Sequence, residues 1–171
     1  MDFIKLAQTR YSVRAYKSDP VPAELLQQVL EAARLAPTAV SRQPFRFLVI
    51  HTAGREKELL RVYPRPWFSQ APLLIGICTL PGQAWVRKYD QKNYAEVDAA
   101  IAMDHLIMSA TAAGLGTCWV AAFDPQAARE IFRLPPEAAP LLFTPLGYAA
   151  DTPGPKQRKP LESLVQYELW S

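Results

Sequence analysis

Three polar side chains that could bind a ligand alternate with less polar ones along residues 10–16. Successive side chains of an extended chain point to opposite faces, so Arg10, Ser12 and Arg14 would share one face. Two guanidinium groups and a hydroxyl on one edge are suited to binding a phosphate or a polarised carbonyl. The same pattern is typical of a surface strand with solvated arginines. The local sequence leaves both interpretations open.

A polar loop at residues 38–44 separates a predicted helix from a predicted strand. Thr38, Ser41 and Gln43 give this loop two small hydroxyls and one amide. Such a loop can simply connect two elements, or it can present hydrogen-bond donors and acceptors to a ligand. Its composition does not distinguish these roles.

A basic arm begins at residue 151. It carries Lys156 and Arg158, and it ends in the apolar side chains of Leu161, Leu164, Val165, Leu169 and Trp170. So much exposed apolar surface on a terminal arm is unfavourable in a single subunit. The arm is therefore predicted to pack on another surface, such as a second subunit.

Residues 97–119 are predicted to organise the chain around these segments. Their polar residues fall on two narrow stripes of a helix, and the rest of its circumference is apolar, as in a buried helix. Gly114 and Gly116 predict its end, because glycine readily adopts the left-handed conformation that caps a helix C-terminus. Residues 118–123 then predict a buried strand.

The remaining pattern predicts helices over residues 2–8, 22–36, 56–62 and 125–132, and strands over residues 45–50, 73–78 and 141–148. Asp2 and Asp124 are the expected N-caps of the first and last of these helices, and Pro22 suits the first helical position of the second. Pro145 interrupts the last strand, which predicts an edge position or a bulge. Residues 81–94 lack a clear period and hold scattered aromatic and basic side chains. That composition fits either a lid over a site or a segment that seals the edge of the core.

The 171 residues predict one domain with a substantial core. The net charge of +3 includes no clustered basic face, which argues against nucleic-acid binding. Neither a signal peptide nor a membrane-spanning segment is recognisable, so a cytoplasmic protein without a membrane partner is expected. Cys78 and Cys118 lie in apolar, strand-like runs and are predicted to be buried, reduced thiols.

Catalysis by side chains is poorly supported. The sequence has no P-loop, no zinc-ligand spacing and no Gly-x-Ser-x-Gly elbow. His51 at a predicted strand end and His105 on the predicted buried helix form no evident Ser/His/Asp arrangement. We therefore expect neither a catalytic side chain nor a metal site, and chemistry that is carried by a cofactor.

Four segments, taken together and in order, resemble motifs of the FMN-dependent nitroreductases over nearly the whole chain. Residues 10–14 are similar to an Arg-x-Ser-x-Arg signature. This resemblance implies that FMN is bound by Arg10, Tyr11, Ser12 and Arg14. Arg10 and Ser12 would hold its phosphate and ribityl side, and Arg14 would reach the N1/O2 edge of the isoalloxazine.

The other three segments extend the resemblance. Residues 37–44 are similar to a Pro-Ser-x-x-Asn-x-Gln-Pro loop that contacts FMN from the opposite subunit, which implies contacts from Pro37, Thr38, Ala39, Ser41 and Gln43. Thr38 replaces the serine of this motif, and Ser41 replaces the asparagine. Residues 114–123 imply that backbone N–H groups face flavin N5 and O4, at Val120, Ala121 and Ala122. Residues 146–148 and 156–158 resemble the basic segment that closes on the phosphate, through Lys156 and Arg158.

The resemblance implies an α+β, nitroreductase-like fold with a central, mostly antiparallel sheet flanked by helices. It also implies an intertwined homodimer in which residues 1–171 form one domain and the arm, about residues 151–171, extends onto the partner. The implied reaction passes hydride from NADH or NADPH to flavin N5. A nitroaromatic, a quinone or a similar small molecule would then be reduced in a ping-pong sequence.

Three alternatives stay open. The same scaffold could support dehalogenation, enone reduction or oxygen-dependent flavin chemistry. The protein could bind flavin without turnover. Finally, the basic residues could belong to an anion- or nucleic-acid-binding module, which would bind polyanions in a salt-dependent way.

Overall fold

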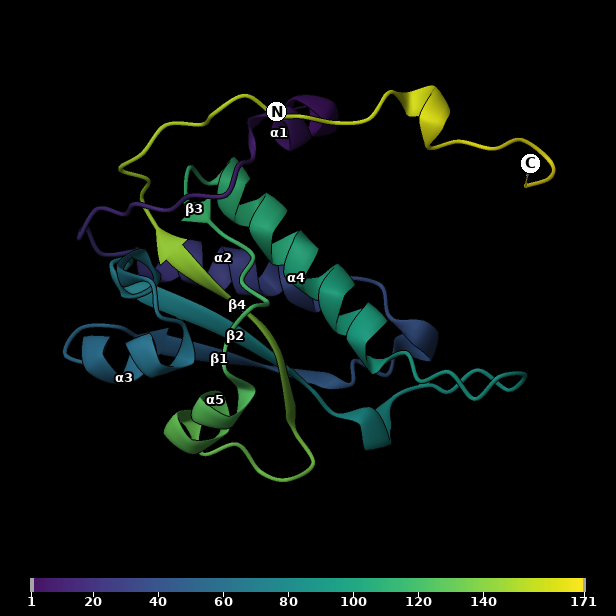
Figure 1. The fold of residues 1–171 in the computed structure, drawn as a ribbon, viewed down its shortest axis with the longest axis horizontal. Helices are drawn as coiled ribbons and strands as arrows, with labels where there is room; N and C mark the ends of the chain where they lie inside the picture. The colour runs from purple at the N-terminus through teal and green to yellow at the C-terminus, as the bar shows by residue number, and fades with distance from the viewer. Residues whose placement is uncertain (1, 171) are drawn as a thin grey trace.

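The computed structural model describes residues 2–170, which form an antiparallel four-stranded sheet with helices on both faces (Figure 1). The sheet order is β1-β2-β4-β3, with β1 at Phe45–His51, β2 at Leu73–Thr79, β3 at Gly116–Thr117 and β4 at Ala139–Gly147. The helices are α1 (Phe3–Thr9), α2 (Ala23–Arg34), α3 (Glu56–Val62), α4 (Ala95–Ala112) and α5 (Pro125–Phe132). Short 3₁₀ turns occur at η1 (Ala39–Ser41), η2 (Pro66–Ser69), η3 (Pro81–Gln83) and η4 (Leu161–Ser163). The α+β prediction and the predicted helices are confirmed.

Two helices begin where their capping residues predict. Asp2 accepts a hydrogen bond from the Lys5 N–H at 3.4 Å, and Asp124 accepts from the N–H groups of Gln126 and Ala127 at 2.8 and 3.0 Å. Each carboxylate satisfies N–H groups that the first helical turn leaves free. Pro22 lies one position before the start of α2 rather than at its first helical position.

The buried helix is α4, which packs against α2 and one face of the sheet. Ala99, Ala102 and Ala110 are fully buried on it, and these small side chains allow close approach of the neighbouring elements. Gly114 has a φ of +76° and ends the helix as predicted. Gly116 does not: it lies in β3, where an added Cβ would be 2.7 Å from a Val13 methyl. Close approach, rather than a left-handed turn, therefore explains this glycine.

The predicted strand over residues 118–123 is wrong. Only Val120 continues the pairing, by exchanging backbone hydrogen bonds with Phe143 at 2.9 and 3.0 Å. At Cys118 the N–H donates to the buried Thr144 hydroxyl at 3.0 Å. A side chain thus replaces a backbone partner and interrupts the ladder.

Pro145 does not place β4 at an edge, because β4 pairs with β2 on one side and with β3 on the other. The two-residue β3 pairs with Leu146 and Gly147 and ends before Pro145, so on that side the proline has no ladder partner. The sheet does contain a bulge, but at Leu141. There Ile77 pairs with Leu142 while Cys78 pairs with Pro140.

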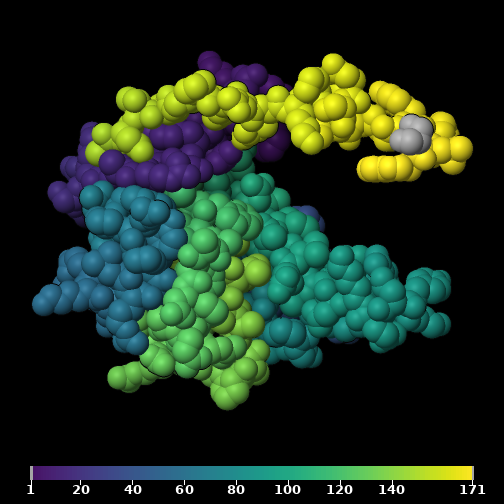
Figure 2. All heavy atoms as spheres, in the orientation of Figure 1, coloured from purple at the N-terminus to yellow at the C-terminus, as the bar shows by residue number. Residues whose placement is uncertain are grey.

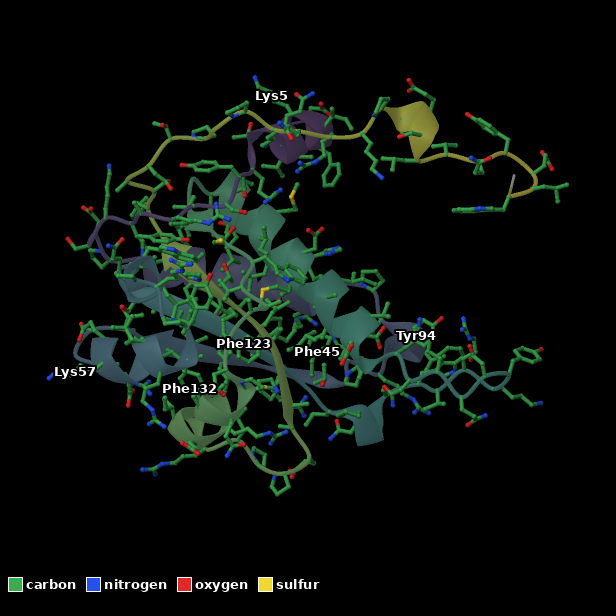
Figure 3. All side chains as sticks on the ribbon, viewed as in Figure 1. Lys5, Phe45, Lys57, Tyr94, Phe123 and Phe132 are labelled. Carbon is green, nitrogen blue, oxygen red and sulfur yellow. The ribbon has the colours of Figure 1, made fainter. Side chains whose placement is uncertain are left out.

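The second face of the sheet is covered by α3, α5 and η2. Phe143 lies at its centre, with ring centroids 4.9 Å from Phe123, 5.4 Å from Phe132 and 6.3 Å from Phe68. Figure 3 shows Phe123 and Phe132 beside α5. Opposite Phe143 on β2 is Gly76, where an added Cβ would lie 2.6 Å from the Phe143 ring.

Residues 85–94 form a hairpin that projects from the body of the molecule (Figure 1). Val86 pairs with Asn93, and the Trp85 and Tyr94 rings meet edge to face at 5.1 Å. Figure 3 places Tyr94 beside the N-terminal end of α4. Tyr89 is 94% exposed at the far end of the hairpin. The outer part of this segment therefore does not seal the core.

Cys78 and Cys118 are both buried and unbonded, as predicted. Burial raises the pKa of the Cys78 thiol to about 11, so this thiol stays protonated at neutral pH. Among the helices of residues 2–170, none has the length and apolarity that crossing a membrane would require.

We expect Gly76→Ala to lower the free energy of unfolding by about 1–3 kcal/mol, because the added methyl must displace the fully buried Phe143 ring. Urea denaturation of the purified variant measures this. Gly82→Ala is the matched control, since a Cβ at Gly82 meets nothing within 4 Å. Equal losses of stability in the two variants would contradict the close packing at Gly76.

Candidate functional site

The first predicted segment runs extended beside β3. Its anchor is Val13, which is 1% exposed and donates its N–H to the Thr117 carbonyl at 2.9 Å. Ser12 forms a parallel bridge with Thr117 and is half-buried, while Arg14 is exposed. The predicted alternation is therefore confirmed at Val13 and Arg14.

The Cys118 thiol lies close enough to this segment to be influenced by its polar side chains. Burial raises the pKa of this thiol, and Arg14, Ser12 and Arg10 act in the opposite direction. All three predicted polar side chains therefore act on one point, at the start of residues 118–123.

Asp151 ties the beginning of the arm to this segment. Its carboxylate accepts the Arg14 N–H at 2.7 Å and the Tyr11 hydroxyl at 3.2 Å, and its carbonyl accepts the same hydroxyl at 2.9 Å. Burial, together with Asp151, raises the pKa of Tyr11. The Tyr11 hydroxyl is thus engaged within the chain. Sequence analysis missed Asp151, because no local pattern distinguishes it from a solvated acid.

A group of cations forms where the arm passes α1. The Lys156 ammonium donates to the carbonyls of Ala7 and Gln8, close to the C-terminal end of α1 where a cation is favoured. Burial lowers the pKa of Lys156, and the nearby Arg10 and Arg158 lower it further. The tertiary structure therefore brings Lys156 and Arg158 to Arg10, although about 150 residues separate them in sequence. Figure 2 shows the arm lying across the N-terminal helix.

Arg10 and Arg14 have guanidinium groups without internal partners. Neither group makes a hydrogen bond or an ion pair with any residue in the 2–170 range. Guanidinium and ammonium groups that lack an internal acceptor are suited to binding an external phosphate or carboxylate.

Two hollows lie along α4, the first of them beside Arg10, and we call them together the α4 groove. The first, of about 270 Å³, is lined by Arg10, Asp104, Ile107, Thr117 and Trp119. The second, of about 330 Å³, is lined by Glu96, Val97, Ala100, Trp119, Ala121, Leu141 and Leu142. Trp119 borders both hollows and is 43% exposed. The groove therefore has a polar end, where Arg10 and Asp104 lie, and a mostly apolar end at Ala121, where Glu96 is the one charged residue among the described residues that line it.

The backbone after Trp119 offers free donors at the apolar end. Ala121 and Ala122 are exposed, and their N–H groups donate to no acceptor among the described residues. Val120 differs, because its N–H donates to the Phe143 carbonyl at 2.9 Å. The expectation of a free donor is therefore wrong for Val120 and fits Ala121 and Ala122.

The predicted loop of residues 37–44 lies at the opposite end of α4 from residues 10–14 (Figure 1). Its Ala39 N–H donates to Asp98, at the start of α4, whereas Thr111 lies near Arg10 and Tyr11 at the other end. Thirteen helical positions at about 1.5 Å each place these two ends roughly 20 Å apart. One subunit therefore does not bring this loop to the cations.

Two predicted side chains of the loop are engaged internally. The Thr38 hydroxyl accepts the Gln43 N–H at 3.3 Å, and the Gln43 amide donates to the Arg34 carbonyl at 2.8 Å. Pro37 and Ser41 are exposed.

Groups that could support other chemistry are not assembled. Within residues 2–170, no three His, Cys, Asp or Glu side chains are placed to hold a metal ion. His105 lies on the exposed side of α4, with Nδ1 3.0 Å from the Ile101 carbonyl. The α4 groove is instead suited to binding a ligand, because Arg10 lies at one end and an apolar surface with free N–H groups lies at the other.

The fold is of the α+β class, with a buried helix on one face of an antiparallel sheet and a hollow beside that helix that Arg10 borders. The profile of the Nitroreductase family matches residues 7–63 and 55–148. The chain therefore belongs to the nitroreductase family and is an oxidoreductase of that type.

Individual relatives agree with this assignment. The chain is 30% identical over 200 residues to an NADH dehydrogenase of Thermus thermophilus, covering 99% of this chain and 96% of the relative. It is 28% identical over 185 residues to an FMN reductase [NAD(P)H] of Bacillus subtilis, covering 99% and 74%. The crystal structure of a nitroreductase family protein from Clostridium difficile 630 superposes with a TM-score of 0.89 at 37% identity, covering 99% of this chain and 100% of that one.

We expect Asp151→Ala to loosen the junction between the arm and residues 10–14, because the Arg14 N–H and the Tyr11 hydroxyl lose an acceptor. Amide exchange should accelerate at Arg14 and over residues 152–158, and stability should fall by about 1–3 kcal/mol. Hydrogen-exchange mass spectrometry and urea denaturation measure these effects. Glu162→Ala, an exposed acid on the same arm, is the control. Unchanged exchange in Asp151→Ala would show that this carboxylate does not hold the arm.

Proposed function

We propose that the protein is a homodimeric, FMN-dependent oxidoreductase that uses NADH or NADPH to reduce a small acceptor such as a nitroaromatic or a quinone. The observation that carries this proposal is the α4 groove, which has the unpaired guanidinium of Arg10 at one end and the unpaired backbone N–H of Ala121 at the other. Family membership supports it, as does the name of the Bacillus subtilis FMN reductase [NAD(P)H].

The donor set fits the phosphate of FMN. Arg10 borders the groove and has no internal acceptor among the described residues. It lies near Lys156 and Arg158, since Arg10 and Arg158 both lower the pKa of Lys156. Like charges held together repel one another, and a bound dianion would relieve that repulsion. Arg10, Lys156 and Arg158, with Ser12 beside them, would hold this end of the cofactor.

The apolar end fits a flat ring. Ala121 and Ala122 present N–H groups to solvent, and the backbone pairing of Val120 with Phe143 holds that stretch in place. Val97, Ala100 and Leu141 supply a surface without competing hydrogen-bonding groups. These residues would orient the isoalloxazine and exclude water from one side of it.

Two observations favour a homodimer in which residues 1–171 form one domain with an exchanged arm. Leu161, Leu169 and Trp170 are 73%, 80% and 92% exposed, and the end of the arm extends beyond the rest of the molecule (Figure 2). Such apolar surface is characteristic of a subunit interface. The loop of residues 37–44 lies too far along α4 to reach the cations of its own subunit. A second copy could supply both the surface for the arm and Pro37, Thr38, Ala39 and Ser41 to the site.

Bound FMN would supply the redox chemistry, taking two electrons from the nicotinamide and passing them to the acceptor in a ping-pong sequence. The chain's own part is binding and electrostatics. Arg14, exposed and without an internal partner, would place a positive charge beside the ring where reduction adds negative charge. This arrangement needs no side-chain acid or base.

We expect the purified protein to be yellow, with about one non-covalent FMN per chain. We also expect substitutions of Arg10 and Arg14 to have different effects on the bound FMN. Arg10→Ala should weaken FMN binding, because it removes a phosphate ligand. Arg14→Ala should bind FMN with modest loss but lower its midpoint potential by some tens of millivolts, since about 30 mV corresponds to 1.4 kcal/mol for a two-electron couple.

Flavin fluorescence titration and reductive titration against a reference dye measure these two effects. Bleaching of the flavin on addition of NADH or NADPH tests turnover directly. A colourless protein that also fails to bind added FMN would refute the proposed function, and an unchanged potential in Arg14→Ala would remove that residue's role.

We expect truncation after Tyr148 to abolish both dimerisation and FMN binding, because it removes the apolar tail together with Lys156 and Arg158. Truncation after Lys159 separates the two effects, since it removes the tail and keeps both cations. Light scattering gives the oligomeric state, and absorbance at visible wavelengths gives the flavin content. If the chain truncated after Tyr148 remains a dimer with full flavin, the arm has neither role.

A further inference from the structure

Asp98 is a buried carboxylate that the ligand groove does not use. It lies in the first turn of α4 and is 2% exposed. Its Oδ2 is buried without a hydrogen-bond partner among residues 2–170, and no cation there forms an ion pair with it. Burying a carboxylate in this way is costly, although the N-terminal end of a helix offsets part of the cost. A buried carboxylate with an unpaired oxygen is therefore expected to have a structural or functional role.

The one hydrogen bond that this side chain makes within the described chain reaches the loop of residues 37–44. Oδ1 accepts the Ala39 N–H at 2.9 Å, at the first residue of η1. A hydrogen bond to a buried charged acceptor is stronger than one between neutral groups. Asp98 is therefore a direct link between α4 and this loop.

The loop has a backbone that requires such a restraint. Val40, Ser41 and Gln43 have φ values of 47°, 57° and 50°, in the left-handed region that non-glycine residues disfavour. This conformation persists only where the surroundings enforce it. Val40 is nevertheless 68% exposed and Ser41 is exposed, so packing within the subunit does not enforce it at these two residues.

The strained residues are displayed outward at the end of the helix that borders the groove. Asp98 occupies the buried side of α4, whereas the adjacent Val97 and the nearby Ala100 line the apolar hollow. One helical turn therefore holds the loop with one side and forms the groove with the other.

We propose that Asp98 is a positioning residue that holds the loop of residues 37–44, through the Ala39 N–H, in the strained conformation that presents Ser41 to FMN in the partner subunit. This role rests on the proposed function. The buried carboxylate of Asp98 would thus increase the affinity for FMN without contacting the cofactor.

The test compares Asp98→Ala, Asp98→Asn and Ala39→Pro. Asparagine keeps an oxygen that can accept the Ala39 N–H, whereas alanine removes the acceptor and proline removes the donor at a position where a helical turn tolerates it. We expect the Kd for FMN to rise about tenfold in Asp98→Ala and in Ala39→Pro, the effect of one charge-assisted hydrogen bond. It should rise much less in Asp98→Asn, which keeps a weaker, neutral hydrogen bond. The double variant Asp98→Ala/Ala39→Pro should lose little more FMN affinity than either single variant, because both changes break the same hydrogen bond.

Thr52→Val is the matched control for a general loss of stability. Thr52 is 3% exposed and donates to the Ala71 carbonyl at 2.5 Å, away from this loop. This variant should be less stable with an unchanged Kd for FMN. In the apoprotein, exchange of the amides of residues 39–43 should accelerate in Asp98→Ala and not in Thr52→Val.

The outcomes separate this role from the proposed function. Wild-type protein that does not bind FMN would overturn both. Wild-type binding together with an unchanged Kd and unchanged loop exchange in Asp98→Ala would overturn the positioning role alone. If Asp98→Ala does not fold, Ala39→Pro and Asp98→Asn still test the positioning role. An unchanged Kd for FMN in Ala39→Pro would contradict it, and so would a tenfold rise of the Kd in Asp98→Asn.

Discussion

The burial of α4 is the constraint on which the rest of the structure depends. This 18-residue helix packs its alanines against α2 and one face of the sheet, and its ends determine where the functional segments lie. Residues 10–14 lie near its C-terminal end and the loop of residues 37–44 near its N-terminal end. The remaining side of α4 borders the groove. A shift of α4 would therefore move every part of the candidate site at once.

Two acids hold the segments that we propose to bind the ligand. Asp151 holds the beginning of the arm to residues 10–14, and Asp98 holds the loop of residues 37–44 to α4. Both bonds are formed by carboxylates with backbone N–H groups, so they constrain the main chain directly. The guanidinium groups of Arg10 and Arg14 are left without internal acceptors among the described residues, and they remain available to a ligand.

The hydrogen bonds of the preceding residues explain why the backbone N–H groups of Ala121 and Ala122 are available as well. Thr144 takes the N–H of Cys118 and Phe143 takes that of Val120, after which the chain leaves the sheet. The next two N–H groups then face solvent. The course of the backbone therefore leaves these two donors available, and alanine is adequate where only the main chain is used.

The sequence by itself determined the periodic and capped elements. Apolar spacing located α4 and the longer strands, and Asp2 and Asp124 marked two helix starts, because these signals depend on neighbours within a few residues. It also predicted the polar face of residues 10–14. Only the tertiary structure decided the end of pairing after Thr117, the roles of Asp98 and Asp151, and the meeting of Arg10 with Lys156. Each of these depends on a partner distant in sequence: Thr144 is 26 residues from Cys118, and Ala39 is 59 residues from Asp98. A local pattern contains no information about which distant donor or acceptor the fold will bring within reach.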